Sequence, residues 1–189
     1  MKSMKYDKLP DLKILDEKEK VLREQSKEVT FPLSNEDKKI IEDSLTYLEM
    51  SQIDEYAEKY DLRAGWGLSL IQLGIKKRIF VIAEELEKGK FKRYVVINPK
   101  VLSHSEELVY VGEGEGCLSV NRDVEGIVPR YARMNVEAYD IDGNKYTIRV
   151  REELSICFQH EMDHLDGILF VDKIDKKNPY KNMNKMREI

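Results

Sequence analysis

Two histidines and a glutamate form the pattern H-E-x-x-H at residues 160–164. Side chains four residues apart on a helix lie one turn apart on the same face, so His160 and His164 can bind one metal ion. Glu161 is placed to accept a proton from a water molecule that the metal activates. A random chain of this length would contain the pattern roughly 1% of the time or less, so two unrelated surface histidines are the weaker interpretation. The pattern predicts metal-dependent hydrolysis.

A catalytic metal held by two histidines needs a third protein ligand and an open position. Cys157 lies on the same helical stripe but roughly 10 Å from the second histidine, which favours a core or pocket-lining role. Phe170 stands where metzincins have a third histidine, and Glu188 lies near a chain end, where frayed structure is usual. Cys117 remains, in the glycine-rich segment 112–120, where the backbone can approach other groups closely. Its alternative interpretation is an incidental cysteine in a mobile loop.

Two segments show the pattern of helices that could carry or support these residues. Residues 35–50 place apolar side chains at helical spacing, and Ser34 before them is a typical capping residue. Residues 151–165 contain neither glycine nor proline and are the best candidate for a second helix, which would include the H-E-x-x-H pattern. Residues 63–74 contain three glycines and are expected to form a loop with an extended piece.

The strand signals favour antiparallel sheets. Residues 79–83 and 94–97 are rich in β-forming side chains and flank a lysine-glycine-lysine turn, and residues 101–111 are expected to add another strand. A second hairpin spans residues 136–150 around Asp142-Gly143, a strong turn signal. The order of elements predicts an α+β fold with antiparallel sheets flanked by helices, rather than a βαβ repeat. With no linker or repeat, residues 1–189 are expected to form one domain.

Composition limits the class of protein. The 189 residues are 41% apolar and 36% charged, which is typical of a globular chain, and the net charge of −4 gives no basic field for nucleic acid. The longest apolar run, residues 79–83, is far shorter than the roughly 20 residues that cross a bilayer. Residues 1–8 are positively charged without an apolar stretch, so no secretory signal is expected. We therefore expect a cytoplasmic protein without a disulfide.

Three separated segments closely resemble the motifs of the peptide deformylases, in the same order. Residues 115–119 (EGCLS) match the cysteine motif without a change, and residues 159–167 (QHEMDHLDG) match the helix motif in full. Residues 65–72 (GWGLSLIQ) match the first motif in part. Residues 119–122 (SVNR), and the longer segment between the first two motifs, are similar to the type 2 branch found in Gram-positive bacteria.

The resemblance implies an enzyme that removes the formyl group from N-formylmethionine at the N-terminus of nascent polypeptides, releasing formate. It implies that Cys117, His160 and His164 hold one divalent metal ion. It further implies Fe²⁺ in the cell, with Ni²⁺, Co²⁺ or Zn²⁺ able to substitute, whereas ligand type alone favours zinc. Glu161 would act as general base and then pass the proton to the departing amine.

The same resemblance assigns stabilisation of the tetrahedral oxyanion to the Gln72 side-chain amide, the Leu118 backbone N–H and the metal. The peptide substrate would lie extended beside the first motif, like an added strand. Ile156 and Cys157, one turn before the ligands on the helix, are candidates for the pocket of the methionine side chain. The implied substrate-binding residues are Gly65, Trp66, Gly67, Gly116, Ile156 and Cys157.

The first motif departs from the family pattern. Ser69, Leu70 and Ile71 stand where the family usually has Ala-Ala-Pro or similar, and Trp66 stands where Ile or Val is usual. Leu70 is much larger than alanine, so the packing behind the metal is expected to differ. Trp66 is expected to narrow the substrate groove or to stack against the methionine pocket. Gln72 keeps its place, so the departures bear on efficiency and selectivity more than on the reaction.

Two alternatives stay open at this stage. An H-E-x-x-H metalloendopeptidase would not need Cys117, and a non-catalytic relative would hold a structural metal with four protein ligands. Glu115 and Arg130 are expected to form an ion pair that braces the cysteine segment. The lysine-rich residues 173–189 are interpreted as a solvated end, with transient ribosome association as the alternative. N-formylmethionyl peptides are the expected partners, with no direct DNA or membrane contact.

Overall fold

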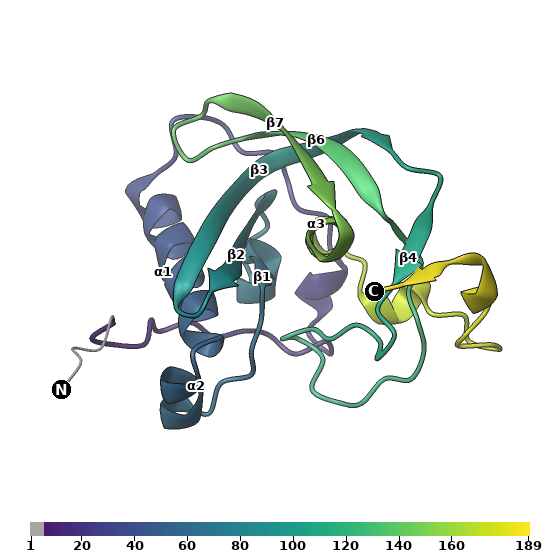
Figure 1. The fold of residues 1–189 in the computed structure, drawn as a ribbon. Helices are drawn as coiled ribbons and strands as arrows, with labels where there is room; N and C mark the ends of the chain where they lie inside the picture. Colours follow the sequence, from purple (N-terminus) through teal and green to yellow (C-terminus); the bar gives the residue numbers. More distant parts are fainter. Residues whose placement is uncertain (1–5) are drawn as a thin grey trace.

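The computed structural model describes residues 6–189, so residues 1–5 of the segment tested for a secretory signal lie outside the described part. Its helices and strands form an α+β fold in which a curved antiparallel sheet wraps around one helix (Figure 1). The α-helices within residues 6–189 are α1 (Asn35–Ser51), α2 (Asp54–Tyr60) and α3 (Glu152–Leu165). Short 3₁₀ helices cover Lys20–Arg23, Leu70–Leu73, Phe170–Lys173 and Met183–Lys185.

Two sheets are present in the described part of the chain. The larger is antiparallel throughout, with strand order β1-β2-β3-β6-β7. Its strands are β1 (Gly67–Ser69), β2 (Ile79–Glu87), β3 (Lys90–His104), β6 (Arg133–Tyr139) and β7 (Lys145–Arg151). The smaller has the order β5-β4-β8, formed by β5 (Arg130–Tyr131), β4 (Leu108–Tyr110) and β8 (Arg187–Glu188). The predicted α+β class is confirmed, and both predicted hairpins form.

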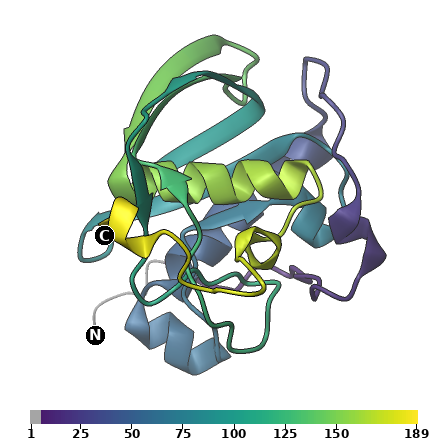
Figure 2. The same cartoon turned by 90° about the vertical axis from the view of Figure 1, so that its right-hand side faces the viewer.

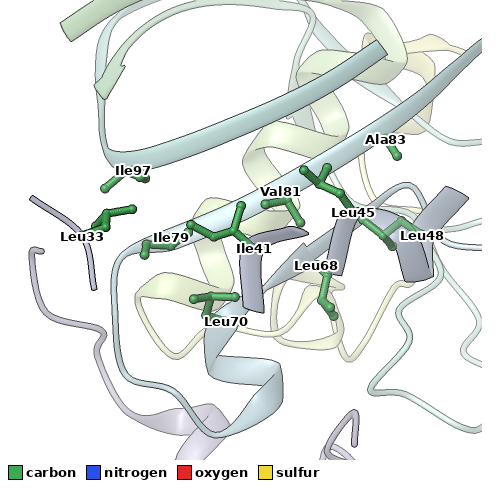
Figure 3. Packing of buried hydrophobic residues seen from close by; sticks show 10 residues of the cluster. All are labelled: Leu33, Ile41, Leu45, Leu48, Leu68, Leu70, Ile79, Val81, Ala83 and Ile97. Atoms are coloured by element: carbon green, nitrogen blue, oxygen red, sulfur yellow. The ribbon is translucent and has the colours of Figure 1, made fainter. Parts of the chain in front are cut away.

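Strand β2 explains the long apolar run in the sequence, because both of its faces are buried. Ile79, Val81 and Ala83 point into a cluster with α1 (Figure 3), whereas Phe80 and Ile82 point into the cluster on the other face. Side chains alternate between the two faces of a strand, so a strand covered on both sides must be apolar at every position. The sheet is thereby fixed between two helices.

Helix α3 lies on the concave side of the sheet, where it contacts β1, β2, β6 and β7 (Figures 1 and 2). Phe158 anchors it, since its ring is fully buried and meets the rings of Phe80 and Tyr94 edge-on at 5.3 and 6.0 Å. The helix begins one residue later than the predicted segment 151–165. The predicted start of α1 is confirmed, because Ser34 Oγ accepts a hydrogen bond from the Asp37 N–H.

Two sequence predictions need correction. Residues 101–111 do not form one strand: β3 runs to His104 and pairs with β6, and β4 begins at Leu108 and pairs with β5 in the other sheet. The break lies at 105–107, where the Ser105 hydroxyl donates to the Glu107 carbonyl and closes a turn. Glu188 is not frayed, because β8 pairs in parallel with β4. None of the helices within residues 6–189 has the length and apolar character needed to cross a membrane.

Replacing Phe158 with alanine should destabilise the fold by about 3–5 kcal/mol, because the cavity left between α3 and the sheet cannot be filled by its rigid aromatic neighbours. Urea denaturation followed by circular dichroism measures this change. The control is Leu86→Ala on the exposed end of β2, which should change the free energy of unfolding by less than about 0.5 kcal/mol. Equal effects in the two variants would contradict this account of the core.

Candidate metal centre and active site

A thiol and two imidazoles converge beneath the sheet. His160 and His164 lie one turn apart on α3, and Cys117 comes from the loop between β4 and β5. Their ligand atoms all lie within 4.8 Å of one another, and Cys117 Sγ is 3.3 Å from His164 Nε2. All three side chains are largely shielded from solvent. One cysteine and two histidines form a donor set that suits zinc, iron or nickel and leaves a position open, so the residues fit a catalytic divalent metal.

Two N–H groups, one from the cysteine loop and one from the 3₁₀ helix Leu70–Leu73, lie near the sulfur. The Ser119 N–H donates to Cys117 Sγ at 3.4 Å, and Gln72 Nε2 lies 3.7 Å from the same atom. Hydrogen bonds to sulfur favour the thiolate, which is the form that binds metals. The Gln72 amide is itself fixed, because Oε1 accepts from the Ser69 N–H at 3.0 Å and Nε2 donates to Ser119 Oγ at 3.0 Å.

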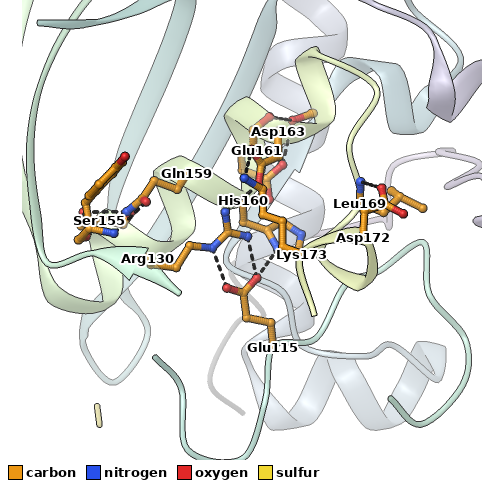
Figure 4. A network of polar contacts seen from close by, with 12 residues as sticks. Glu115, Arg130, Ser155, Gln159, His160, Glu161, Asp163, Leu169, Asp172 and Lys173 are labelled. Carbon is orange, nitrogen blue, oxygen red and sulfur yellow. Dashed lines mark hydrogen bonds and ion pairs between the residues drawn. The ribbon is translucent and has the colours of Figure 1, made fainter. Parts of the chain in front are cut away.

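A buried charge network orients the first histidine (Figure 4). Glu115 Oε2 lies 2.9 Å from His160 Nδ1, so the other ring nitrogen faces the cysteine. The predicted ion pair of Glu115 with Arg130 is confirmed at 2.7 Å, and Arg130 also contacts Asp163 on α3 at 2.6 Å. Burial opposes ionisation of Glu115, but the hydrogen bonds from Arg130 and His160 outweigh it and lower its pKa to about 2. The glutamate is therefore an anion that holds the imidazole in one orientation.

Glu161 lies against β1, and its side chain is almost fully buried. Burial raises the pKa of this carboxyl above its usual value, although the charge of His160 and the Ser69 hydrogen bond oppose the shift. Ser69 Oγ lies 2.7 Å from Glu161 Oε2 and 2.9 Å from the Glu161 carbonyl oxygen. On the other side, an added Cβ at Gly67 would lie 2.6 Å from Glu161 Oε1. Only a glycine there leaves room for the carboxylate.

A pocket of about 470 Å³ opens beside these groups. Every site residue named from the sequence lines this pocket except His164, which is buried. Trp66 lies at the pocket with 39% of its surface exposed, and Leu70 packs in the cluster between α1 and β2. Phe170 stacks near the His160 ring at 6.0 Å. The lining residues that the sequence analysis did not assign to the catalytic, metal-binding or substrate-binding set are Arg63, Ala64, Val111, Gly114, Glu115 and Glu153.

The fold and the site together define a metal-dependent hydrolase, and comparison with known proteins gives its family. A family model for polypeptide deformylases matches residues 11–180. The peptide deformylase of Ligilactobacillus salivarius is 49% identical over 162 residues, which cover 84% of this chain and 87% of that protein. Peptide deformylase 2 of Bacillus subtilis is 44% identical over 160 residues, covering 85% and 87%.

Solved structures agree with this result. The peptide deformylase of Thermotoga maritima aligns with a TM-score of 0.69 at 30% identity, covering 87% of this chain and 97% of that one. A plant peptide deformylase aligns with a TM-score of 0.74 at 27% identity, covering 95% and 89%. The chain belongs to the polypeptide deformylase family, and it is of the Gram-positive type. Members of this family are metal-dependent hydrolases of N-formylmethionyl peptides.

Replacing Arg130 with methionine should destabilise the protein by about 3–5 kcal/mol, because Glu115 would keep a buried charge without its partner. Urea denaturation measures the change. Lys90→Met breaks an ion pair whose members are both well exposed, so it should cost less than about 1 kcal/mol. A small effect of Arg130→Met would show that water reaches the network.

Replacing Gly67 with alanine should lower kcat for formate release by about 100-fold, because the added methyl group displaces the Glu161 carboxylate from its position. The matched variant is Gly65→Ala, whose Cβ meets the end of the flexible Leu118 side chain. It should lose less activity than Gly67→Ala in the same steady-state assay. The reverse order would argue against a fixed position for Glu161.

Proposed function

We propose that this peptide deformylase removes the formyl group from N-formylmethionine at the N-terminus of nascent polypeptides in the pocket beside Cys117, His160 and His164. The observation that carries the proposal is the convergence of one thiol and two imidazoles next to a buried carboxylate, Glu161. An endopeptidase of the H-E-x-x-H type has no use for the cysteine, so the geometry favours deformylation over that alternative.

Cys117, His160 and His164 are the proposed ligands of one divalent metal ion, which makes α3 a central metal-binding helix. We propose Fe²⁺ in the cell, with Ni²⁺, Co²⁺ or Zn²⁺ able to substitute. When bound, such an ion acts as a Lewis acid toward the formyl carbonyl and toward water. The Glu115–His160 hydrogen bond supports this assignment, since a carboxylate on the far nitrogen of an imidazole is typical of metal-binding histidines.

Glu161 is the proposed general base, which takes a proton from the attacking water and passes it to the departing amine. Its burial, which raises the pKa of its carboxyl, makes the carboxylate a better proton acceptor. Glu161 lines the pocket, and the Ser69 hydroxyl holds one of its carboxylate oxygens, Oε2.

The Gln72 side-chain amide and the Leu118 backbone N–H are the proposed donors to the tetrahedral oxyanion. Both residues line the pocket, and the Gln72 amide is held by its bonds to Ser69 and Ser119. Donors fixed before the reaction need no reorganisation when charge develops, and each is worth roughly 3–4 kcal/mol.

The peptide substrate is proposed to lie extended along β1, which is one of the two edge strands of the larger sheet. Gly116, which also lines the pocket, supports this path, because nothing lies within 4 Å of the place its Cβ would occupy. Further lining residues, from the segment 65–67 and from α3, complete the proposed groove and methionine pocket: Gly65, Trp66, Gly67, Ile156 and Cys157.

We further propose that residues 1–189 act as one deformylase domain in the cytoplasm. The proposed partners are nascent N-formylmethionyl peptides, with transient contact to the ribosome and no direct contact with DNA or membranes. The net charge of −4 supports the exclusion of DNA, because duplex binding relies on a basic surface.

Formate release from N-formylmethionyl peptides tests the proposal, with protein loaded with iron or nickel in the absence of oxygen. Glu161→Gln should lower kcat by about 1000-fold while metal content stays the same, because it removes the base and keeps the ligands. Cys117→Ser should lower metal content as well as activity. The control is His104→Gln, which changes the third histidine, outside the pocket. Full activity of Glu161→Gln would overturn the assignment of the base.

A further inference from the structure

The residues that follow Cys117 form a tight turn whose carbonyl groups converge on one arginine. The Val120 N–H donates to the Cys117 carbonyl at 3.0 Å and closes the turn. Arg63, from the loop before β1, donates Nη1 to the Val120 carbonyl at 3.0 Å. Its Nη2 donates to the Cys117 carbonyl at 3.1 Å and to the Leu118 carbonyl at 2.9 Å. One guanidinium thus binds three main-chain oxygens of residues 117–120.

Arg63 has no carboxylate partner that would explain its position. Within residues 6–189 it forms no ion pair, and its guanidinium donates hydrogen bonds to the carbonyls of the turn. A guanidinium offers five donors in a rigid planar fork, and hydrogen bonds from a charged donor are stronger than neutral ones. The charge and planar shape of this guanidinium therefore serve to bind the main-chain carbonyls of residues 117–120.

The planarity of the peptide group relates these carbonyls to the active site. In a trans peptide, the C=O of one residue and the N–H of the next point in opposite directions. The Leu118 carbonyl binds Arg63, and the Ser119 N–H on the other side of the same peptide plane donates to Cys117 Sγ. The Ser119 N–H therefore points away from the guanidinium and toward the sulfur, although Arg63 also lines the edge of the pocket. By the same geometry, the Cys117 carbonyl bound to Arg63 directs the Leu118 N–H away from the arginine.

We propose that Arg63 is a positioning residue that holds the turn 117–120 so that the Leu118 N–H faces the formyl oxygen and the Ser119 N–H faces the cysteine sulfur. The proposal rests on the proposed function and deepens it. A charged donor on the Cys117 carbonyl also polarises that amide, which makes the Leu118 N–H a stronger donor to the oxyanion. Arg63 acts through the backbone and does not touch the reacting atoms.

The test compares Arg63→Met and Arg63→Lys with Arg122→Met in the metal-loaded full-length protein. Both Arg63 variants should lower kcat by about 10- to 100-fold, less than loss of a whole oxyanion donor, while KM changes by less than about threefold. Lysine should not rescue the rate, because a point charge cannot bridge three carbonyls. Arg122 lies near the same turn but pairs with Glu17 at the surface, so Arg122→Met should keep the parent kcat.

A second measurement tests the position of the turn without relying on enzyme activity. Amide hydrogen exchange at residues 118 and 119 should speed up in the Arg63 variants and stay unchanged in Arg122→Met, with metal content equal in all. If Arg63→Met does not fold, Arg63→Lys supplies the same comparison.

A raised KM with unchanged kcat would overturn the proposal and make Arg63 a substrate contact. Unchanged kinetics and exchange would also overturn it. Absence of formate release from the parent and Arg122→Met would instead overturn the proposed function.

Discussion

The architecture of the site depends on a charge that is buried at the meeting point of two distant segments. Arg130 is only 2% exposed, and an isolated charge at that depth would be costly to desolvate. Glu115 from the cysteine loop and Asp163 from α3 both contact it. Arg130 therefore links the cysteine loop to α3, because its charge is paired with one carboxylate from each. Because Glu115 also binds His160, the same charge that joins the segments sets the orientation of an imidazole.

This network can orient side chains only because the elements behind it are rigid. Strand β2 is covered by α1 on one face and by α3 on the other, so α3 has little freedom to shift against the sheet. Strand β1 then brings Gly67 and Ser69 against Glu161. The carboxylate packs against the backbone of Gly67, where a side chain would clash with it, and its other oxygen accepts a hydrogen bond from the Ser69 hydroxyl. Packing thus fixes the helix, and short polar contacts fix the atoms on it.

Local patterns in the sequence predicted the parts of the fold that local interactions determine. The helix at 35–50 has helical spacing of its apolar residues and a capping serine, and the helix bearing His160 follows from a run without glycine or proline. The hairpin around residues 142–143 contains its own turn signal. Residues 101–111 were misjudged because their strand propensity is continuous, whereas the change of partner after His104 depends on where β5 and β6 lie. Glu188 was misjudged because its strand is completed by a segment about 80 residues away in the chain.

The residues of the site also divide into those that local sequence reveals and those that only the tertiary structure brings together. His160, Glu161 and His164 could be named because their types and spacing carry the chemistry, whereas Cys117 was assigned through its resemblance to the deformylase cysteine motif. The structure brings Cys117, His160 and His164 together. The contact of Arg63 with the cysteine turn spans more than 50 positions of sequence, and no motif marks it. The contact of Ser69 with Glu161 spans 92 positions. Such contacts depend on tertiary structure, so a single sequence contains no signal for them.

The Ser69 hydroxyl has a consequence that follows from counting hydrogens. It carries one hydrogen, yet it lies within bonding distance of two acceptors of the same residue, the Glu161 carboxylate and the Glu161 carbonyl. While Glu161 is an anion, that hydrogen belongs with the carboxylate. When Glu161 holds a proton, the carboxyl becomes the donor to Ser69 and the hydroxyl hydrogen turns to the carbonyl. The same three oxygen atoms therefore accommodate the residue in either charge state by rotation of a single O–H bond.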